Sequence, residues 1–229
     1  MVLPLQERMG SIKAKRPAAC PPSMRVSSLS VIIPAPGRAA SMKVLHVNRA
    51  QARATHINGR TVLTAIGKRA AQGPVPVHRM GLEGDEQADL SVHGGLSKAV
   101  YAYPHEHYAF WQTVRAQARV SLWDEPLDPG MLGENLTIQG LTEDALWIGD
   151  QLRLPGCVLA VSEPRFPCFK FNAVMGFSQA GKLMAQSGYC GSYLAVIEPG
   201  MVCAGDRIEL IPGPREVNLR ELFRARVKT

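Results

Sequence analysis

Short stretches of alternating hydrophobic and polar residues follow one another from residue 42 onward. A period of two is typical of a half-buried strand, so residues 43–47 and 61–66 are predicted to be β-strands. Asn58-Gly59 lies between them and predicts a hairpin turn, because both residues tolerate a positive φ. Further strands are predicted at 99–103, 136–138 and 157–162, and after the Gly-Asp turns at 149–150 and 205–206.

Helical periodicity is confined to a few segments. Apolar positions after Pro104 have the spacing of a helix that is predicted to reach about Arg119, and proline suits a first helical turn. A shorter helix is predicted at 178–186, ended by Gly188. Many short strands with turns rich in Gly, Pro and Asp predict a mainly β, α+β fold, in which helices pack outside a barrel-like sheet.

The composition changes at about residue 41. Residues 1–41 contain several prolines, six basic residues and one acidic residue, which predicts a poorly ordered N-terminal extension. Their acid-poor composition also fits a transit peptide, although helical amphipathicity is missing. We therefore predict one domain at 42–213 and a short tail or helix at 214–229.

Charge and cysteine content narrow the function classes. The net charge is +7, but beyond residue 41 there are 20 basic and 18 acidic residues, so no nucleic-acid surface is expected. No apolar run approaches the roughly 18 residues of a membrane span, so no membrane partner is expected either. Five cysteines without a C-x-x-C pair favour reduced thiols in a cytoplasmic protein and argue against zinc ribbons and iron–sulfur clusters.

One cysteine has a distinctive setting. Cys168 lies within Arg165-Phe166-Pro167-Cys168-Phe169-Lys170, directly after a predicted strand. Nearby cations favour the thiolate, which is the form that binds a soft metal or attacks an electrophile. Pro164 and Pro167 stiffen the loop and are expected to present the sulfur at the end of the strand. The alternative is a small buried hydrophobe, as most free cysteines are.

A second candidate region combines carboxylates with glycines. Residues 81–89 hold four acidic side chains, and His93, Gly94, Gly95 and Lys98 follow them. Adjacent glycines let the backbone approach a ligand closely, and Lys98 offers a counter-charge to phosphate. An acidic surface loop beside a glycine turn is the alternative. The residue order is not that of a P-loop, and no dinucleotide-binding glycine motif follows a strand.

Other polar residues are less specific. Glu134 and Asn135 precede the strand at 136–138, where they suit either a polar ligand or a turn. His105 and His107 lie two residues apart on the predicted helix and do not share a face, so we interpret them as surface or supporting residues.

Five segments in order resemble the YiiM-like branch of the MOSC family, which is named for the C-terminal domain of molybdenum cofactor sulfurases. They are 81–89, 92–95, 99–108, 133–136 and 164–172. The resemblance extends over about residues 42–211. It implies a largely antiparallel β-barrel with flanking helices, and a molybdenum cofactor (molybdopterin), whose pterin dithiolene carries a phosphate.

The resemblance also implies roles for the residues around the thiol. Cys168 matches the cysteine that is expected to bind molybdenum. Arg165, Lys170 and Lys98 are expected to neutralise the phosphate or the charge of the reduced cofactor.

The remaining candidates are expected to surround the pterin. His93, Gly94 and Gly95 are expected to shape the cleft, with His93 as a catalytic proton donor. Asn135 and Asn172 are expected to offer amide hydrogen bonds to the pterin edge.

The function implied by the resemblance is the reduction of small N-hydroxylated compounds, such as hydroxylaminopurines and amidoximes. No segment resembles a flavin, haem or iron–sulfur module, so an external flavoprotein or iron–sulfur protein is the expected electron donor. Two alternatives are a non-catalytic carrier that passes the cofactor or sulfur through Cys168, and a binding module with a buried thiol. Pyridoxal phosphate is not expected, because no lysine has a recognisable Schiff-base context.

Overall fold

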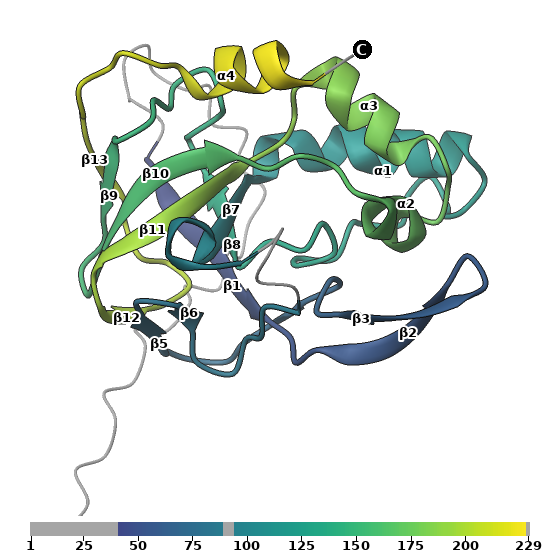
Figure 1. Cartoon of the computed structure of the whole chain (residues 1–229), viewed down its shortest axis with the longest axis horizontal. Helices are drawn as coiled ribbons and strands as arrows, with labels where there is room; N and C mark the ends of the chain where they lie inside the picture. Colours follow the sequence, from purple (N-terminus) through teal and green to yellow (C-terminus); the bar gives the residue numbers. More distant parts are fainter. Residues whose placement is uncertain (1–40, 89–93, 228–229) are drawn as a thin grey trace, which may run out of the picture.

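A computed structural model describes residues 41–88 and 94–227, and the structural statements below refer to these residues. An eight-stranded sheet forms most of the fold (Figure 1). In order across the sheet, the strands are β13 (Glu209–Ile211), β9 (Gln151–Arg153), β10 (Val158–Pro164), β11 (Ser192–Glu198), β7 (Val100–Pro104), β8 (Leu136–Gln139), β1 (Lys43–Arg49) and β4 (Arg69–Ala70). Strands β7 and β8 are parallel, whereas the other neighbours are antiparallel.

The chain just before β13 returns to the start of β1. The Val44 N–H donates to the Asp206 carbonyl over 2.9 Å, and the Ile208 N–H donates to the Met42 carbonyl over 2.9 Å. The predicted α+β class is confirmed, because the chain forms a large sheet together with helices. Within the described residues, however, these contacts do not amount to paired strands that close the sheet, so the barrel stays a prediction.

Two smaller sheets complete the strands. They are the hairpin of β2 (Arg53–Ile57) and β3 (Arg60–Thr64), and the set β12 (Gly200–Val202), β5 (Val75–His78) and β6 (Gly81–Leu82). The predicted hairpin turn is confirmed, since Asn58 has a φ of 50° and Gly59 a φ of 75°. An isolated hairpin is only marginally stable in water, so this one depends on contacts with the rest of the fold.

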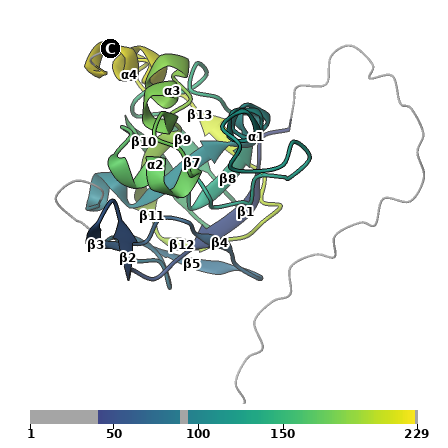
Figure 2. The same ribbon diagram turned by 90° about the vertical axis from the view of Figure 1, so that its right-hand side faces the viewer.

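Helices flank the large sheet (Figures 1 and 2). They are α1 (Tyr108–Gln117), α2 (Phe169–Met175), α3 (Ala180–Ser187) and α4 (Leu219–Arg226), with short 3₁₀ turns η1 (Leu96–Lys98) and η2 (His105–His107). The helix predicted at 178–186 is confirmed as α3, and Gly188 follows it in a left-handed conformation. None of the helices in the described ranges is long and apolar enough to cross a membrane.

Two helix predictions need correction. Pro104 does not open a helix: it is the last residue of β7, and η2 separates it from α1. Helix α2 was not predicted, because only Phe171 and Met175 of its seven residues are buried and the apolar period is too short to recognise.

The core has two parts, one inside the large sheet and one between the sheet and the helices. In the second part, Trp111 of α1 and Phe171 of α2 pack with their ring centroids 5.3 Å apart. Tyr101 and Tyr103 of β7 belong to the same cluster. This aromatic packing holds α2 beside the end of β10, where the chain carries Cys168.

The described cysteines differ in state and exposure. Cys157, Cys168 and Cys190 have free thiols, and Cys168 is partly exposed whereas the other two are buried. Cys203 is disulfide-bonded, so the prediction of reduced thiols is wrong for this residue.

Candidate active-site cleft

A cleft of about 640 Å³, including space open to solvent, lies between the end of the large sheet, hairpin β2–β3 and helix α2. Five residues predicted from the sequence line it: Lys98, Asn135, Arg165, Cys168 and Lys170. They come from three separate segments of the chain, and the fold alone brings them together.

Cys168 is positioned by the elements on either side of it. Strand β10 ends at Pro164, and Cys168 is the extended residue directly before α2, with a φ of −128°. Its carbonyl accepts a hydrogen bond from the Phe171 N–H over 2.9 Å, which starts the helix. The predicted presentation of the thiol at the end of a strand is therefore confirmed.

Arg165 is a buried cation beside that thiol. Its side chain donates to the Leu132 carbonyl over 2.9 Å, and its guanidinium lies 5.0 Å from the Tyr101 ring centroid and 5.2 Å from that of Phe171. Burial opposes its charge, but Tyr101, Tyr193 and Cys168 together raise the pKa of Arg165, so it remains a cation. Within the described chain, no carboxylate lies within ion-pair distance of it.

Lys98 and Lys170 add positive charge to the wall. Lys98 Nζ lies 3.7 Å from a Glu163 carboxylate oxygen and 5.9 Å from the centroid of the Tyr193 ring. Lys170 Nζ donates to the Leu63 carbonyl over 3.1 Å, so this lysine joins α2 to the hairpin.

A third lysine, Lys68, also lines the cleft and was not predicted from the sequence. Its Nζ forms an ion pair with Asp85 Oδ1, and the two side chains are 8% and 5% exposed. Burial lowers the pKa of Lys68, although Asp85 opposes this effect. Asp85 also accepts hydrogen bonds from the Ala50 N–H and the Asn135 amide, each over 2.8 Å.

Asn135 is a cleft residue whose amide already has partners. Its Oδ1 accepts from the Tyr101 N–H over 3.0 Å, and its Nδ2 donates to Asp85 and to the Asn48 carbonyl, the latter over 3.3 Å. These bonds join β7, β8 and the acidic segment. The predicted contact with a pterin stays a prediction: both Nδ2 donors already have partners, whereas Oδ1 has room to accept a second hydrogen bond.

Three other predicted residues, Gly94, Gly95 and Asn172, do not line the cleft. The Gly95 N–H donates to Gln87 Oε1 over 2.8 Å, and Asn172 Oδ1 accepts from the Gly181 N–H over 2.7 Å, which ties α2 to α3. His93 lies outside the described residues.

Sequence reasoning also missed two tyrosines of the wall. Tyr101 and Tyr193 face each other across β7 and β11, with ring centroids 5.3 Å apart. The alternation of 99–103 was a signal for Tyr101, because it placed Tyr101 and Tyr103 on one face of a strand. Lys68 had no comparable signal, since its position depends on how the chain returns after the hairpin.

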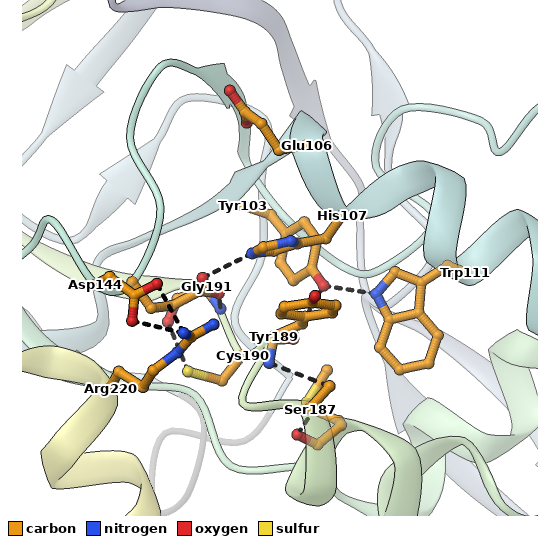
Figure 3. Close-up of polar contacts among 12 residues, drawn as sticks. Tyr103, Glu106, His107, Trp111, Asp144, Ser187, Tyr189, Cys190, Gly191 and Arg220 are labelled. Carbon is orange, nitrogen blue, oxygen red and sulfur yellow. Dashed lines mark hydrogen bonds and ion pairs between the residues drawn. The ribbon is translucent and has the colours of Figure 1, made fainter.

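A second cluster of polar contacts surrounds His107, which does not line the cleft (Figure 3). His107 Nε2 lies 2.7 Å from Glu143 Oε2, and the His107 ring stacks on Tyr189 with centroids 3.8 Å apart. Glu143 Oε1 accepts from the Gly191 N–H over 2.7 Å. His107 is therefore neither a surface residue nor a cleft residue, because the turn of η2 directs it inward while His105 stays exposed.

The described residues contain no group of three or more His, Cys, Asp or Glu side chains arranged to hold a metal ion. The cleft instead contains one partly exposed thiol, Cys168, with basic side chains along the wall, on a mixed α+β fold. The MOSC domain matches residues 89–209, more than half of the chain, and the chain belongs to the MOSC domain family.

Relatives are consistent with this assignment. The chain is 40% identical to YflK of Bacillus subtilis over 73% of its own length and 72% of that protein, and 37% identical to YiiM of Escherichia coli over 69% and 68%. A protein of Gibberella moniliformis named "Reductase" is 35% identical over 73% of this chain, which corresponds to 30% of the fungal protein. The crystal structure of YiiM from Geobacillus stearothermophilus superposes with a TM-score of 0.63 and 27% identity, over 80% of this chain and 82% of that one.

Proposed function

We propose that this chain binds the molybdenum cofactor in the cleft, with Cys168 as its ligand, and reduces N-hydroxylated compounds with electrons from a separate reductase. The observation that carries the proposal is the partly exposed thiol of Cys168, which lines the cleft beside buried Arg165 and is not part of a disulfide. Membership of the MOSC domain family supports a cofactor-associated function, and the relative named "Reductase" supports a redox reaction.

The chemistry of the wall suits this cofactor. A thiolate is a soft ligand, whereas phosphate oxygens are best bound by guanidinium and ammonium groups. Arg165 is buried without a carboxylate partner in the described part of the chain, and a buried cation of this kind is stabilised by an anionic ligand. Lys98 and Lys170 extend the positive charge along the cleft.

When bound, the cofactor would supply the two-electron removal of oxygen from the substrate. The residues of the chain would hold and orient it. Cys168 would bind the metal, while Arg165, Lys98 and Lys170 would bind its anionic groups. His93, Gly94 and Gly95 would act from the segment before Lys98, and Asn172 from helix α2. We do not assign a role to pyridoxal phosphate.

A redox protein is the proposed partner, because the sequence carries no motif for a flavin or an iron–sulfur cluster of its own. A flavoprotein or iron–sulfur protein would deliver electrons to the cleft. The rival function is a non-catalytic carrier, which would use the same thiol to hold the cofactor or a persulfide without turnover. The accessible setting of Cys168 fits both functions, so activity must separate them.

The test uses protein purified from a host that makes the cofactor. Reduction of benzamidoxime, driven by reduced methyl viologen, would be measured for the wild type and for Cys168→Ala. We expect turnover by the wild type and a loss of about 100-fold or more in the variant, because losing a ligand costs more than losing its outer partners. Cys157→Ala, which removes a buried thiol before β10, is the matched control and should keep its activity.

Two results would contradict the proposal. Full activity in Cys168→Ala would show that the reaction does not need this thiol. Stoichiometric molybdenum in the wild type without turnover, with any of several donors, would favour the carrier instead.

A further inference from the structure

We propose that Lys68, held by Asp85, is the proton donor of the cleft and protonates the oxygen that leaves the N-hydroxylated substrate. This inference rests on the proposed function and adds a catalytic residue to it. Lys68 belongs to none of the five segments that carry the family resemblance.

The position of Lys68 is fixed by its backbone. Its N–H donates to the Gly130 carbonyl over 2.9 Å. Gly130 packs so closely against it that a Cβ atom at residue 130 would lie 2.5 Å from the Lys68 carbonyl oxygen. The backbone segments around residues 68 and 130 are therefore held together. The side chain of Lys68 lines the same cleft as Cys168.

The ammonium group of Lys68 is buried and only partly satisfied. Its side chain is 8% exposed, and an ammonium carries three N–H donors. Within the described residues its one hydrogen-bond partner is Asp85. Because Lys68 lines the cleft, a substrate oxygen bound there could accept a hydrogen bond from one of the remaining N–H donors.

Asp85 is placed to orient the lysine. It accepts hydrogen bonds from the Ala50 N–H, from Asn135 and from Lys68 itself. These three bonds fix the position of the carboxylate, and the carboxylate in turn holds the lysine in place. Asp85 therefore places one residue of the acidic segment in the cleft wall as the partner of Lys68.

Burial favours release of the proton from Lys68. Burial and the Arg165 cation lower the pKa of Lys68, while Asp85 and Glu134 raise it, and the net pKa is below the ordinary value of 10.5. Lys98 and Lys170 line the same cleft and add positive charge. A general acid works best when its pKa lies near the working pH, so a lysine with a lowered pKa is a better donor than an exposed one.

The step balances as R–NHOH + 2 e⁻ + 2 H⁺ → R–NH₂ + H₂O. The N–O bond breaks, and the electron pair comes from the external redox protein. Lys68 gives one proton to the departing hydroxyl oxygen, which leaves as water, and the nitrogen takes the second proton from solvent. The neutral lysine then regains its proton from water at the open side of the cleft.

The test compares Lys68→Gln and Lys68→Arg with the wild type in the viologen-driven benzamidoxime assay. Arginine keeps the charge but holds its proton too tightly to donate it. We expect both variants to keep their molybdenum content within about twofold and to lose about 100-fold or more in kcat, the usual contribution of a general acid. Lys182→Gln, an exposed lysine on α3, is the control and should behave as the wild type.

Each other result overturns the inference. Activity in Lys68→Arg within about threefold of the wild type would assign Lys68 a purely electrostatic role. Loss of molybdenum from both variants would make it a cofactor-binding residue. Absence of turnover by the wild type would instead refute the proposed function, so the two failures are distinguishable.

The pH profile of wild-type kcat keeps the inference testable if the variants do not fold. Because the pKa of Lys68 lies below 10.5, kcat should fall with rising pH before that value is reached. A profile that stays flat to pH 10.5 overturns the inference. So does a fall centred near about pH 6.5 that disappears in His93→Gln, since that is the range in which a histidine titrates.

Discussion

The cleft and the His107 cluster each contain a cysteine outside any disulfide and ionisable side chains, yet they are suited to different tasks. In the cluster, His107 pairs with Glu143, Arg220 pairs with Asp144, and the thiol of Cys190 is fully buried (Figure 3). Burial, reinforced by Glu143, raises the pKa of that thiol. In the cleft, Arg165 has no carboxylate partner within the described ranges and Cys168 is partly exposed.

The comparison shows that residue type alone does not identify a site. A buried thiol and polar groups bonded to one another stabilise a fold, whereas a buried cation such as Arg165, with no carboxylate partner in the described residues, is suited to an anionic ligand. Tyr101 connects the two regions, because its ring lies on Arg165 and its hydroxyl donates to the Cys190 carbonyl over 2.8 Å. The cluster therefore supports the cleft from behind.

The largest expected effect comes from breaking the cluster. His107→Ala leaves the buried Glu143 carboxylate without its histidine and removes a ring that stacks on Tyr189. We expect the free energy of unfolding to fall by about 3 kcal/mol, as for other buried pairs that lose one partner. Urea titration would measure this change. A loss of less than about 0.5 kcal/mol, typical of surface substitutions, would show that the pair is not structural.

A matched measurement separates stability from function. The molybdenum content and kcat of folded His107→Ala should stay close to those of the wild type, because His107 does not line the cleft. A specific loss of activity in fully folded protein would contradict the division of labour between the two regions.

An intermediate effect is expected in the reactivity of the thiols. Iodoacetamide should label Cys168 at least about 100-fold faster than Cys157 or Cys190, because thiolate character and access control alkylation. Burial raises the pKa of the Cys157 thiol to about 11, and Cys190 is fully buried. Peptide mapping after brief labelling would measure the rates. Equal labelling of the three thiols in native protein would contradict the difference in reactivity between Cys168 and the two buried cysteines.

The smallest effect concerns Glu134, behind the cleft. Burial raises the pKa of Glu134, although hydrogen bonds from Tyr108, Gly130 and Thr137 oppose this effect. An acid whose pKa is higher in the folded chain loses stability as pH rises from its unfolded value of 4.5 through the folded pKa. Glu134→Gln removes this loss, which amounts to about 1.4 kcal/mol for each tenfold difference in proton affinity.

The measurement is urea unfolding of both proteins between pH 4.5 and pH 8. The stability of Glu134→Gln relative to the wild type should rise with pH across this range. A relative stability that falls with rising pH would mean that the native carboxylate is favoured, contrary to the burial of Glu134.

The comparison also shows what the sequence can and cannot predict. Alternation and the Asn58-Gly59 turn were sufficient for the hairpin, and the strand before Cys168 was placed correctly as β10. These signals are local, since each depends on turn chemistry or on a period of two. The cationic setting of Cys168 was visible because Arg165 and Lys170 are its neighbours in sequence.

The failures have a common physical cause. Pro104 was read as a helix start, but it pairs with Ile138 as the last residue of β7. Lys68 meets Asp85 across 17 residues, and His107 meets Glu143 across 36. Neither pair has a local signal, because tertiary packing decides which polar groups meet. The composition of the cleft could be recognised only from the folded structure, whereas Cys168 could be recognised from its neighbours in the sequence.

The most direct test of the central claim is the molybdenum content of protein purified from a host that makes the cofactor. Wild type and Cys190→Ala should each carry about one molybdenum per chain and Cys168→Ala almost none, because a soft thiolate holds a thiophilic metal. Equal molybdenum in the wild type and in Cys168→Ala would contradict the account.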